Sequence, residues 1–186
     1  MKRKWICVFC GARPGTARLY SLQAAQFGRA LAHRGMGLVY GGASVGLMGV
    51  LADTVLAAGG EVIGVIPQGL LDKEIAHKHL TQLIVTRSLA ERKERMLELS
   101  DAFVALPGGA GTVDELSEVW TAALLGLHAK PIGILNVDGY FHLLVQFIDQ
   151  TVAAGFLDAA GRELLWVRST AEALLDQLAG KGATLL

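Results

Sequence analysis

The sequence contains few cysteines, and both lie in one short segment. Cys7 and Cys10 stand in ICVFCG, and no second Cys-x-x-Cys pair follows to complete a zinc site or a disulfide framework. The segment is otherwise apolar, which is typical of a buried strand in which cysteine acts as a small hydrophobic residue. We therefore expect no metal site and no redox role, and we expect both cysteines to stay reduced in the cytoplasm.

Neither sign of charge dominates the chain. Its 17 lysine and arginine residues balance 17 aspartate and glutamate residues, and 52% of the residues are hydrophobic. This composition is typical of a globular protein and gives no net field that would attract nucleic acid or an anionic membrane. We therefore expect neither as a partner, and any anionic ligand must be held by a local site.

Apolar runs that could cross a membrane are also missing. Glycine, arginine and proline interrupt the apolar N-terminal segment before a signal-length core is complete. A longer uncharged span between Arg34 and Asp53 contains six glycines, so a strand, a turn and a helix suit it better than a membrane helix. We expect a soluble, cytoplasmic protein with a single domain over residues 1–186.

Short apolar segments alternate with amphipathic ones along the whole chain. Strands are predicted at 5–10, 37–42, 61–67, 82–88, 101–107, 131–137 and 164–169, and helices at 17–34, 46–60, 89–100, 113–127, 140–154 and 171–180. Residues 68–79 are interpreted as irregular. This alternation predicts right-handed crossovers and an α/β fold: one doubly wound parallel sheet with helices on both faces.

Three glycine-rich loops follow predicted strands: CGARPG (10–15), GGASVGLMG (41–49) and PGGAGT (107–112). In doubly wound sheets ligands bind at the carboxyl ends of the strands, near the switch in strand order, so the loops are expected to form one pocket. Glycine lets a phosphate approach the main-chain N–H groups at a helix start. Two such loops open helices here, which favours a phosphate site. The P-loop pattern is absent, and GGAGTVD lacks the last glycine of the dinucleotide fingerprint.

The charged residues near these loops each have a purely structural alternative. Thr112-x-x-Glu115 fits a capping box, which would make Glu115 a helix cap. The segment AERKERM could be a solvated helix face with ion pairs such as Glu91–Arg95. His77 and His79 stand in a polar segment, where such residues are more often at the surface than bound to metal.

PGGAGTVDE and ERKERM together resemble the Lonely Guy family of cytokinin riboside 5′-monophosphate phosphoribohydrolases, some of which were once labelled lysine decarboxylases. The family signature is PGGxGTxxE with an upstream Arg-Lys pair, and CVFCGARPG, YGGASVGLMG, EVIGVIP and LGLHAKPIGILNVDGYF follow in family order. The resemblance implies a Rossmann-like domain that hydrolyses the N-glycosidic bond of purine nucleoside 5′-monophosphates, with no cofactor and no metal. It also implies a homodimer.

The same resemblance implies roles for individual residues. The catalytic pair would be Arg92 and Glu115. The substrate-binding positions would be Glu74, Lys93, Gly108, Gly109, Ala110, Gly111, Thr112, Val113, Asp114 and Thr121, and the glycine loop at Gly41 and Gly42 would join them. Ala110 stands where tyrosine is common in the family, so either a cytokinin nucleotide or plain AMP is an expected substrate.

Two other functions were weighed against hydrolysis. A non-catalytic nucleotide-binding or carrier protein of the same fold would use the glycine loops equally well, but it would have no need of Arg92 and Glu115. Lysine decarboxylation is rejected, because such chemistry normally needs a cofactor such as pyridoxal phosphate and the sequence shows no convincing site for one.

Overall fold

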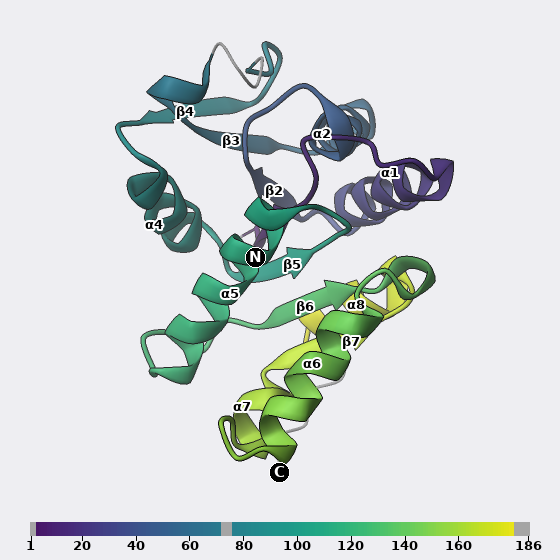
Figure 1. Cartoon of the computed structure of the whole chain (residues 1–186). Helices are drawn as coiled ribbons and strands as arrows, with labels where there is room; N and C mark the ends of the chain where they lie inside the picture. Colours follow the sequence, from purple (N-terminus) through teal and green to yellow (C-terminus); the bar gives the residue numbers. More distant parts are fainter. Residues whose placement is uncertain (1–2, 72–75, 181–186) are drawn as a thin grey trace.

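The structure is a computed structural model that describes residues 3–71 and 76–180 (Figure 1). Its centre is a seven-stranded parallel sheet in the order β4-β3-β2-β1-β5-β6-β7. The strands are β1 (Trp5–Phe9), β2 (Gly37–Tyr40), β3 (Val62–Pro67), β4 (Gln82–Thr86), β5 (Ala102–Ala105), β6 (Ile132–Leu135) and β7 (Leu165–Arg168). All seven predicted strands are present, each somewhat shorter than the sequence indicated.

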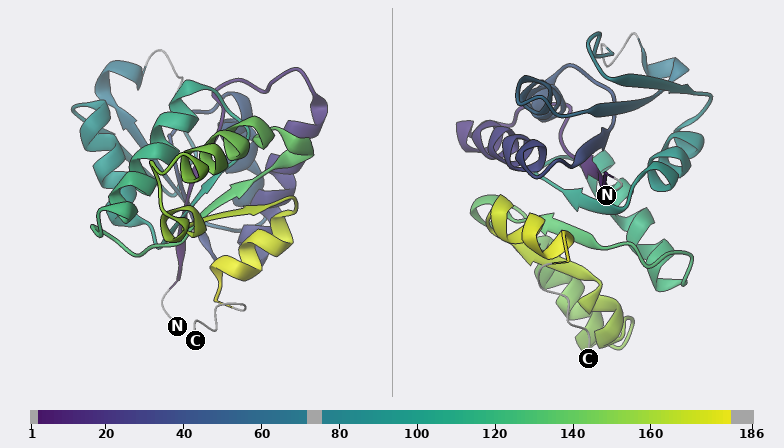
Figure 2. Two further views of the ribbon diagram at one scale, coloured as in Figure 1. Left: turned by 60° about the horizontal axis from the view of Figure 1, so that its bottom comes forward. Right: turned by 180° about the vertical axis from the view of Figure 1, so that it is seen from behind.

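Helices cover both faces of this sheet (Figure 2). The α-helices are α1 (Arg18–His33), α2 (Gly46–Ala57), α4 (Leu89–Leu99), α5 (Ala110–Leu124), α6 (His142–Ala153), α7 (Ala159–Glu163) and α8 (Ala171–Leu178), with short 3₁₀ helices η1 (Gln68–Leu70) and η2 (Val137–Gly139). Helices α1, α2 and α8 pack on one face, and α4, α5 and α6 pack on the other. The doubly wound α/β prediction is confirmed.

The sheet reverses its strand order at β1. From β1 the chain proceeds outward through β2, β3 and β4, then returns to pair β5 on the other side of β1. Val8 of β1 is in register with Tyr40 of β2, and Phe9 is in register with Ala105 of β5. The carboxyl ends of these three central strands therefore lie at one edge of the sheet. A fold of this kind has a crevice at the point where the strand order reverses, between the loops that follow these strands.

Two local features differ from the prediction. The short helix α7 was missed, because the five residues of AAGRE are too few for a helical hydrophobic pattern. Helix α5 begins three residues earlier than expected, at Ala110. No helix among the described residues is long and apolar enough to cross a bilayer.

Candidate active site

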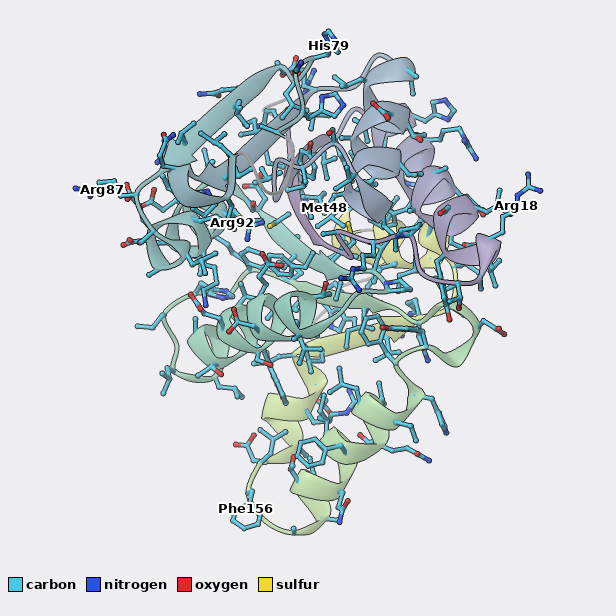
Figure 3. All side chains as sticks on the ribbon, turned by 45° about the horizontal axis from the view of Figure 1, so that its top comes forward. Arg18, Met48, His79, Arg87, Arg92 and Phe156 are labelled. Carbon is cyan, nitrogen blue, oxygen red and sulfur yellow. The ribbon has the colours of Figure 1, made fainter. Side chains whose placement is uncertain are left out.

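A cavity of about 490 Å³ lies at the carboxyl ends of β1, β2 and β5. Its walls contain residues from all three glycine loops, so the predicted convergence of these loops is confirmed. Helices α4 and α5 contribute two charged side chains to the wall, Arg92 and Glu115. Figure 3 shows Arg92 and Met48 side by side at this hollow, pointing inward from different elements.

Arg92 is held on the cavity wall by main-chain acceptors and by a carboxylate. Its Nε donates to the carbonyl of Val65 at 3.0 Å, and its Nη2 donates to the carbonyl of Gly41 at 3.4 Å. Its Nη1 lies 3.1 Å from Oε1 of Glu115. A side chain at position 41 would collide with this guanidinium and with the sulfur of Met48, so any larger residue there would displace Arg92 from this position. The two predicted catalytic residues thus form a buried ion pair that faces the cavity.

The start of α5 offers unpaired main-chain donors to the same cavity. Gly109 is the N-cap residue and no side chain caps the helix. The amide groups of Gly109, Ala110, Gly111 and Thr112 donate to no acceptor among the described residues. Four free N–H groups at the positive end of a helix dipole form an arrangement that can bind a phosphate.

The start of α2 differs from that of α5, although its loop is equally rich in glycine. The amides of Leu47 and Met48 both donate to the carbonyl of Gly11, at 3.0 and 3.3 Å. These two amides therefore donate to the protein's own backbone and are not available to a ligand. The contact joins the loops after β1 and β2 and leaves fewer free amides at the start of α2 than at the start of α5.

The predicted capping box does not form. Thr112 lies inside the first turn of α5, buried, with its hydroxyl against Gly108, and Glu115 lies one turn further along. Gly109, which is extended at φ −96° and ψ −152°, ends the loop and allows the helix to begin three residues before the expected start. Glu115 is therefore a buried partner of Arg92 and not a helix cap.

A second ion-pair cluster joins α4 to α5 outside the cavity wall. The Lys93 ammonium lies 3.0 Å from Oδ2 of Asp114 and also contacts the carboxylate of Glu118. These carboxylates, Glu118 first, raise the pKa of Lys93. The cluster fixes the two helices that carry Arg92 and Glu115.

The ion pair Glu91–Arg95, which the alternative interpretation of α4 gave as an example, does not form. Glu91 bonds to Arg87, at 3.0 Å from its Nε, and not to Arg95, which pairs with Glu98. Ser88 caps α4 and accepts the amide of Glu91, so the first turn of α4 orients Glu91 back toward Arg87.

The structure brings only part of the predicted binding set to the cavity. The residues that line it are Gly41, Arg92, Gly108, Gly109, Gly111, Thr112 and Glu115. Those outside the lining are Gly42, Lys93, Ala110, Val113, Asp114 and Thr121, although the Ala110 amide belongs to the free first turn. Glu74 lies outside the described residues.

The predicted binding set did not include several lining residues, among them Arg13, Tyr20 and Tyr140. The Tyr140 hydroxyl donates to the carbonyl of Gly108 at 2.5 Å, and its ring packs edge-on against Tyr20 with centroids 5.4 Å apart. Arg13 stands in a loop that the sequence did identify. The tyrosines carry no local signal, because only the fold brings α1 and the start of α6 to the glycine loop.

The prediction that both histidines lie at the surface is wrong for His77. Its ring is buried, with Nε2 at 2.9 Å from Oδ1 of Asp53 on α2, and Nδ1 accepts the amide of His79 at 3.2 Å. Its own amide donates to the carbonyl of Gly42 at 2.9 Å. His77 therefore braces the loop that follows β2. His79 is exposed, as expected.

Neither cysteine is suited to nucleophilic chemistry. Cys7 and Cys10 are free and buried, and Cys10 lines the cavity. Burial, with the nearby charge of Glu115, raises the pKa of both thiols well above the usual range. Both therefore stay protonated at neutral pH. Among residues 3–71 and 76–180, no group of three or more potential metal ligands occurs.

Comparison with known proteins places this geometry in a family. Residues 48–178 match the family model described as possible lysine decarboxylase. A probable cytokinin riboside 5′-monophosphate phosphoribohydrolase of Oryza sativa subsp. japonica is 47% identical over 173 residues, which cover 93% of this chain and 70% of the relative. A cytokinin riboside 5′-monophosphate phosphoribohydrolase of Arabidopsis thaliana is 45% identical over 175 residues, covering 94% and 77%.

Solved structures share the fold at lower identity. The molybdenum cofactor carrier protein of Chlamydomonas reinhardtii superposes with a TM-score of 0.74 at 25% identity, over 96% of this chain and 99% of that protein. The molybdenum cofactor binding protein of Rippkaea orientalis gives 0.72 at 22% identity, over 98% and 99%. The family match and the relatives at 45–47% identity decide the assignment. The chain belongs to the Lonely Guy family of cytokinin riboside 5′-monophosphate phosphoribohydrolases, the family whose model is described as possible lysine decarboxylase.

Proposed function

We propose that this protein hydrolyses the N-glycosidic bond of purine nucleoside 5′-monophosphates, either cytokinin ribotides or AMP, to the free base and ribose 5-phosphate. The observation that carries the proposal is the buried Arg92–Glu115 pair, which shares a cavity with the free amides at the start of α5. The relatives named as phosphoribohydrolases support it.

Glu115 supplies the negative charge that this reaction needs. Cleavage of the bond between C1′ and the base passes through an oxocarbenium-like state, which a nearby carboxylate stabilises. The same carboxylate orients the attacking water and accepts its proton as the water oxygen bonds to C1′. The electrons of the broken bond stay with the base, which takes up a proton. Arg92 fixes the rotamer of Glu115 through Nη1.

The first turn of α5 supplies the phosphate site. Glu115 lies six residues after Gly109, which corresponds to about 9 Å along the helix. The 5′-phosphorus is five bonds from the anomeric carbon, which is a shorter span, but side chains in a helix tilt toward its N-terminus and bring the Glu115 carboxylate closer. A phosphate on the Gly109–Thr112 amides would therefore place C1′ within reach of the carboxylate.

The carrier alternative is favoured by the structural likeness to a molybdenum cofactor carrier protein and disfavoured by the charged pair. A carrier of this fold needs the loops and the cavity. It has no evident use for the carboxylate and the guanidinium on the cavity wall. Withdrawing these two charges from water costs free energy, which indicates that the pair has a role. Hydrolysis gives the pair that role.

Incubation with a nucleotide and nucleoside panel tests the proposal. AMP and N6-substituted AMP should release base and ribose 5-phosphate in equal amounts, and adenosine should react far more slowly. Equal kcat/KM for AMP and adenosine would refute the phosphate site. Tight binding of AMP with no base release would instead support a carrier.

We also propose that the protein is a homodimer that works in the cytoplasm. Large apolar side chains are exposed on α6 and at its flanks, including Leu143, Phe147 and Phe156, with exposed fractions of 77%, 62% and 89%. Helix α5 adds Leu125 and Leu127 just beyond its end. Apolar surface of this extent is typical of a subunit interface. The cytoplasmic location stays a prediction from the sequence.

A further inference from the structure

Arg13 is a charged residue of the cavity wall that has no role in the reaction as described so far. It is exposed in the loop after β1 and lines the same cavity as Arg92 and Glu115. Among the described residues its guanidinium forms no hydrogen bond and no ion pair. An exposed arginine that lines a cavity and has no such partner is available to an anionic ligand.

The loop that carries Arg13 is fixed at both ends. At one end Gly11 donates its amide to Pro107 at 3.1 Å and accepts the amides at the start of α2. At the other end Gly15, with φ +74°, lies directly against the ring of Tyr20. Tyr20 packs on Tyr140, which bonds to Gly108. The backbone of Arg13 is thereby held in a fixed position relative to the PGGAGT loop.

The charges of the cavity leave one positive group uncommitted. Glu115 and Arg92 neutralise each other, and Lys93 is bound to Asp114 and Glu118 outside the wall. A phosphate monoester carries a charge of about −1.5 to −2 at pH 7. The start of a helix supplies only about half a positive charge. Among the charged side chains that the structure shows on the wall, Arg13 alone can supply more.

Arg92 has less to offer a phosphate, because its charge is offset by Glu115 and only part of its five N–H donors is still available. Its Nε, Nη1 and Nη2 are each engaged, with Val65, Glu115 and Gly41. Turning it fully to a phosphate would break its ion pair with Glu115 and its hydrogen bonds to the two carbonyl groups. We propose that Arg13 binds the 5′-phosphate and makes the enzyme select nucleoside monophosphates over nucleosides. This inference rests on the proposed hydrolase function.

Kinetics of Arg13→Gln test the inference. Loss of a charge-assisted hydrogen bond should lower kcat/KM for AMP by about 10- to 100-fold. The loss should be mostly in KM, with the slow rate on adenosine unchanged. Arg13→Lys, which keeps the charge, should recover part of the affinity. Thermal unfolding should change little, because the Arg13 guanidinium forms no hydrogen bond or ion pair with the residues that the structure describes.

Arg18→Gln is the matched control. Arg18 begins α1 only five residues away and points into solvent, away from the cavity (Figure 3). Its removal subtracts the same charge and should leave KM within twofold of the wild type. If kcat/KM for AMP fell equally in the two variants, only the overall positive charge of the protein would matter. This result would overturn the specific role of Arg13.

Calorimetry with ribose 5-phosphate separates this inference from the proposed function. If the wild type hydrolyses AMP and Arg13→Gln has an unchanged KM and an unchanged ribose 5-phosphate affinity, the function stands and the role of Arg13 is wrong. If the wild type hydrolyses no monophosphate but loses ribose 5-phosphate affinity on Arg13→Gln, the hydrolase is wrong and the phosphate role stands.

Discussion

Nη1 of Arg92 and Oε1 of Glu115 lie 3.1 Å apart, and the two side chains are only 10% and 11% exposed. The pair joins α4 to α5 across the wall of the cavity. Because both groups are withdrawn from water, removing either charge costs the other this ion pair at a place where water cannot fully compensate. The pair therefore couples the chemistry of the site to the stability of the fold.

Glu115→Gln should lose activity and some stability. Glutamine keeps the size and polarity of the side chain but offers no full charge to a developing oxocarbenium ion and takes no proton from water. We expect kcat on AMP to fall by about 100-fold or more. The free energy of unfolding should fall by about 1 to 3 kcal/mol, because Arg92 loses its counter-charge. Steady-state kinetics and urea unfolding measure the two effects.

Asp114→Asn is the control for that variant, one residue away on the exposed side of α5. Asp114 is 63% exposed and contributes only to the Lys93 cluster. The Asp114→Asn variant should keep most of the activity, and its free energy of unfolding should change by less than about 1 kcal/mol. Wild-type hydrolysis of AMP by Glu115→Gln would show that Glu115 has no catalytic role.

Lys93→Met tests whether Lys93 binds substrate or aligns the helices. The resemblance implies substrate binding, but the ammonium lies on Asp114 and Glu118, outside the cavity lining. We expect kcat to fall by a few fold with KM nearly unchanged, because a slightly displaced α4 misplaces Arg92. A KM that rises tenfold with kcat intact would instead show direct binding.

The architecture could be predicted from the sequence because its signals are local and repeated. Nearly continuous apolar strands such as AFVA, alternating with longer amphipathic segments, indicate a parallel sheet whatever the details of packing. The loops at strand ends are then placed on one edge by topology. Arg92 and Glu115 were found because their motifs stand in the sequence.

Contacts between distant segments could not be predicted in the same way. Thr112 and Glu115 fit a capping box equally well in sequence, and only the extended Gly109 and the position of Arg92 decide against it. His77 is polar and stands in a polar segment, yet Asp53, 24 residues earlier in the chain, pairs with its ring. Such partners depend on the tertiary fold.

The buried thiols should make the protein less stable at alkaline pH. The pKa of Cys7 and that of Cys10 are raised in the folded state, first by burial and then by the charge of Glu115. Above about pH 8.5 the unfolded chain releases these protons and the folded chain keeps them, so the free energy of unfolding falls as pH rises. Each thiol lowers the free energy of unfolding by at most about 1.4 kcal/mol per pH unit.

Urea unfolding between pH 7.5 and 9.5, in the presence of a reductant, measures this slope. The window lies below the unfolded pKa values of tyrosine and lysine, about 10 and 10.4, so the thiols dominate the slope in most of it. The double variant Cys7→Ala/Cys10→Ala should be less stable at every pH, because two buried side chains are shortened, but its stability should change less with pH. A slope equal to that of the wild type would exclude the thiols as its source.

Phe147→Glu should separate the proposed dimer into monomers. Leu143 and Phe147 lie one helical turn apart on α6 and are both exposed, so in a dimer they would be desolvated together. A buried, unpaired carboxylate at such a position costs several kcal/mol of association free energy, enough to dissociate a micromolar complex.

Leu22→Glu is the control, since Leu22 is 50% exposed on α1, which packs on the opposite face of the sheet. Light scattering should give a dimer mass for the wild type and the control and a monomer mass for Phe147→Glu, with similar thermal unfolding curves confirming that the variants fold. A monomeric wild type at micromolar concentration would refute the dimer, and a dimeric Phe147→Glu would place the interface elsewhere.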